Sequence, residues 1–278
     1  MSEYWVHLEG VNQIRRQWGN EQPSELSIRR LLTISSFLKV LSDTTSVDLS
    51  PIPWSENTVF YKLPSEFLDN SFGLEFTYGI TPTLANYLYQ TTILAQHTSY
   101  FVSKDLPIPL SLLSTCFRFS TMLSSWSLDA EDLSCISGAD PTTLQLARIH
   151  ILAFAQSLRI YYHTRVVPCT SSQLALYVEH TAQHLTEIES IKGRRVGLIA
   201  DSAASITWSG FIASCEAELG HRDIWHRWWV SMLRYRIGNI AHLWAVVQGS
   251  WALRDAGLRE VPAWMPLLRQ TGQRVLAV

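Results

Sequence analysis

The sequence predicts an all-α fold: a single multi-helix domain over residues 1–278, built of antiparallel helix hairpins around a central apolar helix. Three observations predict this class. Apolar residues recur every three to four positions, the spacing that lines one face of a helix. Proline, glycine and polar connectors separate these segments. No segment shows the alternating pattern of a strand with comparable strength.

The N-terminal part predicts three helices and one long connector. Apolar residues from Trp5 to Trp18 share one helical face, and residues 24–42 form a second amphipathic segment that opens with Ser24 as N-cap. These two helices could pair as an antiparallel hairpin. Residues 43–80 are rich in proline and glycine and are predicted to be a surface connector. Thr81 and Pro82 then give a clear helix start, and this helix should run to about residue 102.

The middle of the chain predicts the centre of the fold. Residues 110–126 form a further helical segment. Pro141 opens the longest apolar helix, which Pro168 stops, and it is hydrophobic almost all round. We therefore expect it to be the central, most enclosed helix. Residues 171–191 are amphipathic and are predicted to end at Gly193.

The composition argues against nucleic acid and membrane as direct partners. With 24 acidic and 22 basic residues, the net charge of −2 gives no basic surface for phosphates, so direct nucleic acid binding is not expected. No run of about 18 uncharged apolar residues occurs, and the first residues lack the features of a signal peptide. We therefore expect no membrane span and a cytoplasmic location, or a nuclear one for a regulator.

The sequence gives little indication of a metal or cofactor site. His180, His184 and Glu187 lie on one stripe of the 171–191 segment, but a zinc site needs further ligands, and the order is not H-E-x-x-H. A partly solvated helix face is the more usual explanation. The four cysteines lie far apart, without a C-x-x-C pair, and are predicted to be reduced, mostly buried thiols. No phosphate-binding glycine loop or nucleophile elbow is present, so the sequence predicts no metal and no cofactor.

Histidine and tryptophan residues are the remaining candidates for chemistry. His150 and His163 bracket the apolar central segment, and His97 is similarly placed near Tyr100. Such histidines can act as acid or base, although a hydrogen-bonded core histidine is more common. The run "HRDIWHRWWVSMLRYR" could stack on nucleic acid bases, but the helical spacing of its aromatic residues favours core packing.

Several segments together resemble a known family. "WSGFIASCEAELGHRDIWHRWW" followed by "GNIAHLWAVVQGSWALRDAG" is similar to the C-terminal signature of the fungal-specific transcription factor domain, of the type found in arginine-metabolism regulators. "FTYGITPTLANYLYQTTILA", "LRIYYHTRV" and "YWVHLEGVNQI" resemble further segments of that family. The signature positions are Trp208, Phe211, Ile212, Ala213, Glu216, Ala217, Gly238, Asn239, Val247 and Trp251. The resemblance covers nearly the whole chain in order.

The resemblance implies a regulatory domain without its usual DNA-binding module. Family members are typically zinc-cluster transcription factors, with a six-cysteine module ahead of an all-helical regulatory domain. This sequence has no such cysteine cluster and no basic linker, and it is expected to start inside the regulatory domain. DNA reading is therefore not carried over from the family.

Two functions remain open. The first is a stand-alone, cofactor-free cyclase of fungal secondary metabolism, such as a Diels-Alderase, which holds an apolar small molecule in an aromatic pocket. Its lining would come from polar-tipped residues on enclosed segments. His163 and Glu216 are the catalytic candidates, and Tyr78, His97, Tyr162 and Trp208 are the substrate-binding candidates.

The alternative is a truncated transcriptional regulator of a biosynthetic gene cluster, acting through protein partners or a small-molecule effector. A protein partner or a homodimer would then be expected. This hypothesis predicts a large exposed apolar patch, whereas the enzyme hypothesis predicts an enclosed apolar pocket.

Overall fold

The structure is a computed structural model, and its regular elements are helices. The model describes residues 10, 13, 26–47, 49–55, 79–167, 169–194, 207–257, 262–272, 275 and 277. No strand occurs in these ranges, which confirms the predicted all-α class. In chain order the helices are α2 (Leu26–Thr44), α4 (Pro82–Ser103), α5 (Leu110–Ser125), α6 (Pro141–Arg165), α7 (Ser171–Arg194), α8 (Thr207–Cys215), α9 (Arg222–Met232), α10 (Gly238–Asp255) and α11 (Trp264–Thr271).

Two helices begin where a capping side chain precedes a proline. Thr81 accepts a hydrogen bond from the Leu84 N–H at 3.2 Å, and Pro82 follows at the first helical position of α4. Asp140 accepts from the N–H groups of Thr142 and Thr143 ahead of α6. These side chains satisfy N–H groups that lack a partner within the helix. The helix starts that the sequence predicts at Pro82 and Pro141 are confirmed.

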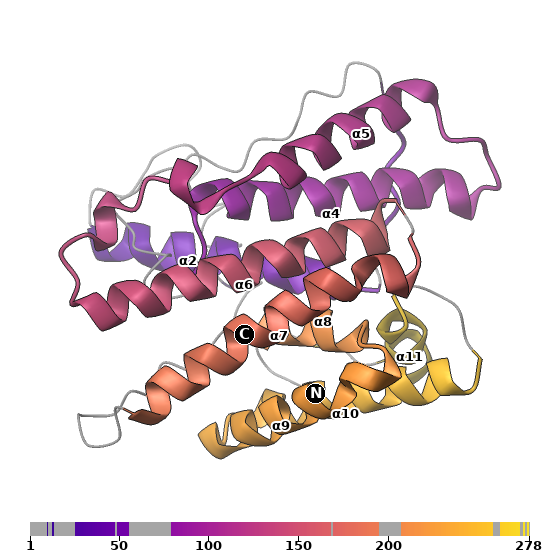
Figure 1. The fold of residues 1–278 in the computed structure, drawn as a ribbon. Helices are drawn as coiled ribbons and strands as arrows, with labels where there is room; N and C mark the ends of the chain where they lie inside the picture. Colours follow the sequence, from indigo (N-terminus) through magenta and orange to yellow (C-terminus); the bar gives the residue numbers. More distant parts are fainter. Residues whose placement is uncertain are drawn as a thin grey trace.

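Helix α6 lies at the centre of the fold, as its apolar composition predicts. It packs against α4, α5, α7 and α8, and Figure 1 shows it between α4 on one side and α7 and α8 on the other. Ile151, Phe154, Leu158 and Ile160 are almost completely buried along its length. The arrangement of the helices as antiparallel hairpins stays a prediction.

The tryptophan-rich segment forms part of the core. Trp225, Trp228, Trp229 and Met232 of α9 are buried, which confirms core packing as the role of this run. Every residue of α8 is buried as well. Within α8, Gly210 lies directly against the indole of Trp228: a Cβ atom at Gly210 would be 2.2 Å from Trp228 Cη2. The glycine therefore allows α8 and α9 to approach closely.

The structure differs from the sequence prediction at the end of α7. Gly193 is expected from the sequence to stop this helix, but α7 continues through it to Arg194, so the prediction of a C-cap at Gly193 is wrong. Glycine ends a helix when its backbone takes the left-handed conformation, and Gly193 has no positive φ. The segment from Trp5 to Trp18, the N-cap at Ser24 and the stop at Pro168 lie outside the described residues.

No helix in the described part of the chain is long and apolar enough to cross a membrane.

Replacing Gly210 by alanine should destabilise the fold. The added methyl group would meet the buried Trp228 ring, and overpacking of this kind typically lowers the free energy of unfolding by about 1–3 kcal/mol. Gly193→Ala is the matched control, because a Cβ atom added there would have nothing within 4 Å and alanine favours a helix by up to about 1 kcal/mol. Urea unfolding of the two variants checks this: equal midpoints would contradict the close approach of α8 and α9.

Candidate functional site

The residues predicted to line a site lie on four elements of the fold. His97 is in α4, Tyr162 and His163 are in α6, Trp208 is in α8, and Glu216 follows the end of α8. Tyr78 lies outside the described residues. The rings of Tyr162 and His163 meet edge-on, with their centroids 5.2 Å apart. His97, Trp208 and Glu216 contact other residues.

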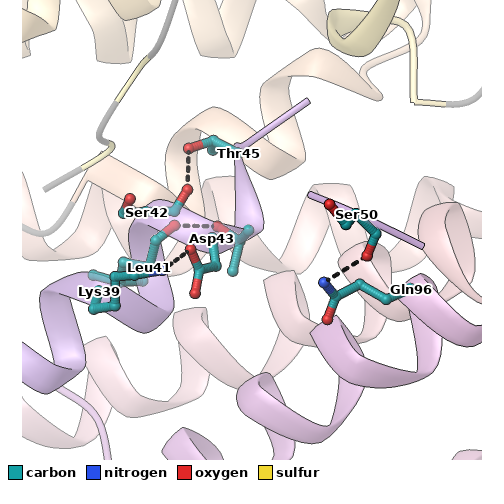
Figure 2. Close-up of polar contacts among 8 residues, drawn as sticks. Lys39, Leu41, Ser42, Asp43, Thr45, Ser50 and Gln96 are labelled. Carbon is teal, nitrogen blue, oxygen red and sulfur yellow. Dashed lines mark hydrogen bonds and ion pairs between the residues drawn. The ribbon is translucent and has the colours of Figure 1, made fainter. Parts of the chain in front are cut away.

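His97 holds a connecting segment against α4. Its ring is 1% exposed, and Nδ1 lies 2.9 Å from the Ile52 carbonyl oxygen. The indole of Trp54 meets the imidazole edge-on, with the ring centroids 5.1 Å apart. The neighbouring Gln96 donates from Nε2 to the Ser50 carbonyl at 3.2 Å, as Figure 2 shows. His97 therefore anchors residues 49–55, although its buried Nε2 has no hydrogen-bond partner.

Tyr162 and His163 connect α6 to its neighbours. The Tyr162 hydroxyl donates to the Cys116 carbonyl of α5 at 2.7 Å, and burial raises the pKa of this phenol. The ring of His163 is parallel to that of Tyr177 on α7, with centroids 6.4 Å apart. Burial lowers the pKa of His163, so its neutral form is favoured. Both side chains thus contribute to helix packing.

Trp208 joins three helices in the interior. It is fully buried and stacks on Phe154 of α6 with a centroid distance of 4.7 Å. Its indole Nε1 donates to the Thr44 hydroxyl at the end of α2 at 2.8 Å. The Thr44 hydroxyl in turn donates to the Leu41 carbonyl at 2.6 Å. A buried indole N–H needs such a partner, so this chain of hydrogen bonds fixes α8 against α2 and α6.

Glu216 forms a buried ion pair with Arg254 of α10. The side chains are 1% and 13% exposed, respectively, and Glu216 Oε1 has no hydrogen-bond partner. Burial raises the pKa of Glu216, against the opposing effect of the Arg254 charge. Close to it in the chain, Ser214 accepts at its carbonyl from Trp251 Nε1 at 2.7 Å. The pair therefore ties the end of α8 to α10.

The cysteines are poor candidates for a nucleophile. Burial raises the pKa of Cys116 to about 11, and it also raises the pKa of the fully buried Cys215. A thiol acts as a nucleophile in its thiolate form, which is scarce near neutral pH at such pKa values. Cys116, Cys169 and Cys215 are free thiols, as the sequence predicts.

The histidines on α7 show no metal-ligand set. Burial lowers the pKa of His184, and the nearby His180 adds to this effect. Within the ranges that the structure describes, no group of three metal-ligating side chains comes together, and His180, His184 and Glu187 lie inside those ranges.

Sequence reasoning missed an exposed apolar stripe at the junction of α4 and α5. We call it the α5 stripe, and its members are Val102, Leu106, Leu110, Leu113 and Phe117. The inner face of α5 buries Leu112, Cys116, Phe119 and Leu123, so α5 is apolar on both sides. Phe117 is 74% exposed. The sequence "LSLLSTCFRFSTMLSS" indicates this surface, because it contains more apolar residues than one face of a helix can hold.

Comparison with known proteins gave one match. A family model described as the fungal-specific transcription factor domain matches residues 1–278. Searches of curated proteins and of solved structures gave no match. The match includes the signature positions Trp208 and Glu216, whose buried contacts connect α8 to α2, α6 and α10.

The pH dependence of stability should report the ionisation of Glu216. Its folded-state pKa lies above the usual 4.5, so above pH 4.5 the folded protein holds a proton that the unfolded chain releases. The free energy of unfolding therefore falls as pH rises through the folded-state pKa, by about 1.4 kcal/mol per unit of the difference in pKa. Relative to Glu216→Gln, the wild type should lose stability from pH 4.5 upward in urea unfolding.

Asp255→Asn is the control, because the contribution of Asp255 to the free energy of unfolding should change with pH in the opposite direction. A hydrogen bond from Arg222 lowers the pKa of the exposed Asp255 below 3.8, so its contribution is present above that pH and is lost as pH falls through the folded-state pKa. A wild type that gains stability over Glu216→Gln as the pH rises would contradict the raised pKa of Glu216.

Proposed function

Because the chain belongs to the fungal-specific transcription factor domain family, we propose that it is the regulatory part of a transcriptional regulator that acts through protein partners. The match over residues 1–278 is the observation that carries this proposal. The genes that it regulates would belong to a biosynthetic cluster, and its place of action would be the nucleus. The cyclase hypothesis stays a prediction, and the family match supports the regulator better.

The charge of the chain supports contact with protein rather than with DNA. A net charge of −2 gives little electrostatic attraction to phosphates, which supply most of the non-specific affinity for nucleic acid. The four cysteines are too widely spaced in the sequence for a zinc cluster. Contact with DNA would therefore have to come from outside residues 1–278.

The α5 stripe supports a docking role for this face of the molecule. Figure 1 shows α5 along the outer side of α4, away from α8 and α10. Arg118 is the only charged residue in α5, so little charge would have to be desolvated when a partner covers it. Contiguous apolar surface of this kind marks interaction sites in soluble proteins. The regulator hypothesis predicts an exposed apolar patch where further N-terminal helices would pack, and the α5 stripe is a candidate for such a patch.

A tethered reporter tests the proposal. The full chain fused to an unrelated DNA-binding domain should change expression of a reporter gene that carries the matching DNA site. Phe117→Ser should reduce that change about tenfold, because a central aromatic anchor typically carries about 1–2 kcal/mol or more of binding energy. Leu219→Ser is the matched control, since Leu219 is equally exposed, at 76%, but lies in a different part of the fold.

Gene deletion separates the two functions. Loss of a regulator should lower the transcripts of its target genes, whereas loss of a cyclase should leave transcripts unchanged and cause an uncyclised intermediate to accumulate. Transcript levels and metabolite profiles measured on the same deletion strain decide between them. An inactive reporter fusion together with unchanged transcripts would overturn the regulatory function.

A further inference from the structure

At the C-terminal end of α6, the Tyr161 hydroxyl and the Nε atom of Arg165 are buried without a hydrogen-bond partner. Tyr161 is fully buried and its hydroxyl makes no hydrogen bond, although Thr92 and Arg165 lie near it. One turn further along α6, the Nε of Arg165 is also buried and has no acceptor. The guanidinium contacts the thioether of Met265 through Nη1, and sulfur is a weak acceptor.

Among the described residues, Arg165 differs from the other enclosed arginines in its acceptors. Where the structure describes the chain, the other enclosed arginines have oxygen acceptors: Arg254 pairs with Glu216, and Arg159 donates to the carbonyls of Leu123 and Trp126. Arg222 pairs with Asp255, although its Nε, like that of Arg165, has no partner. No described carboxylate forms an ion pair with Arg165. A guanidinium held away from water needs an acceptor, preferably a negatively charged one.

The Tyr161 hydroxyl lies close to the positive charge of Arg165. Burial raises the pKa of Tyr161, and the charge of Arg165 and the hydroxyl of Thr92 oppose that rise, so all three groups lie close together. The Thr92 hydroxyl donates to the Leu88 carbonyl at 3.1 Å. The Tyr161 hydroxyl and the Arg165 Nε are the donors here without a hydrogen-bond partner. The negative charge of Asp43 also raises the pKa of Tyr161. Lys39 forms an ion pair with Asp43, drawn in Figure 2, and offsets that charge.

We propose that Arg165 and Tyr161 form a binding site for the carboxylate group of a small organic acid, which takes the place of the Met265 thioether. A carboxylate is a planar acceptor that matches the guanidinium fork and can accept from the phenol as well. A single guanidinium balances the single negative charge of a carboxylate better than the larger charge of a phosphate. Met265 can leave because its side chain has three rotatable bonds.

Binding at this place would connect two distant parts of the chain. Arg165 ends α6, whereas Met265 lies in the first turn of α11, which packs against α10. Displacement of the Met265 side chain therefore changes how α11 contacts the end of α6. The use of this site to regulate transcription rests on the proposed function, but the binding itself does not.

Thermal unfolding of the purified full chain tests the site. The probes are sodium acetate, inorganic phosphate and sodium chloride at equal ionic strength. Acetate should raise the midpoint of unfolding in a saturable way, because a ligand that binds the folded state stabilises it. Tyr161→Phe should lower the affinity for acetate about tenfold, which is the usual effect of losing one hydrogen bond to a charged group. The concentration of acetate needed for half of the shift should rise accordingly. Without acetate, Tyr161→Phe should unfold no earlier than the wild type, because its hydroxyl makes no hydrogen bond.

Arg165→Gln should abolish the acetate response, and Arg148→Gln is the matched control. Arg148 is on the same helix, but it is exposed and lies 3.8 Å from Asp129, so its loss should leave the response unchanged. An equal response of the wild type to acetate and chloride would overturn the site. A response to phosphate alone would overturn the carboxylate assignment. Acetate binding by the wild type, together with an inactive reporter fusion and unchanged transcripts in the deletion strain, would keep the site and overturn the regulatory function instead.

Discussion

The burial of the C-terminal half of α6 is the constraint on which the rest of the structure depends. A helix that contacts four others can expose little polar surface, so each hydroxyl and ring nitrogen on it needs a partner inside the protein. The hydroxyl of Ser157 lies 3.0 Å from the Ala153 carbonyl and 3.1 Å from the Ser209 carbonyl of α8. Tyr162 uses its hydroxyl to hold α5. The polar atoms of α6 therefore fix which neighbour lies on which side.

The elements that the sequence predicts best are those with a local cause. The starts of α4 and α6 follow from Thr81 and Asp140, whose side chains cap N–H groups two or three residues further on. Helical spacing also predicts the burial of α9, since the period of 3.6 is a property of neighbouring residues. The sequence prediction for the end of α7 is wrong because glycine stops a helix through its backbone conformation, and residue identity does not determine that conformation.

The candidate site is harder to predict because its residues are defined by distant partners. Trp208 is a candidate for its polar tip, but the acceptor of its N–H is Thr44, 164 positions earlier in the chain. Glu216 is a candidate as an acid, and its partner Arg254 is 38 positions away. A polar-tipped residue on an enclosed helix has the same sequence pattern whether it lines a pocket or satisfies a neighbour. The contacts favour the second role for both residues.

One hydrogen bond links the part of α6 that carries Tyr161 to the helix that carries the α5 stripe. Tyr161 is a polar group enclosed without a partner, and the next residue, Tyr162, donates its hydroxyl to Cys116 on the inner side of α5. The outer side of the same helix carries the exposed α5 stripe. A carboxylate that draws Tyr161 towards Arg165 would act on the helix turn that anchors α5. Coupling between an effector and a docking face would then require only the α6 backbone and one hydrogen bond, a short path that a Tyr162→Phe variant would break.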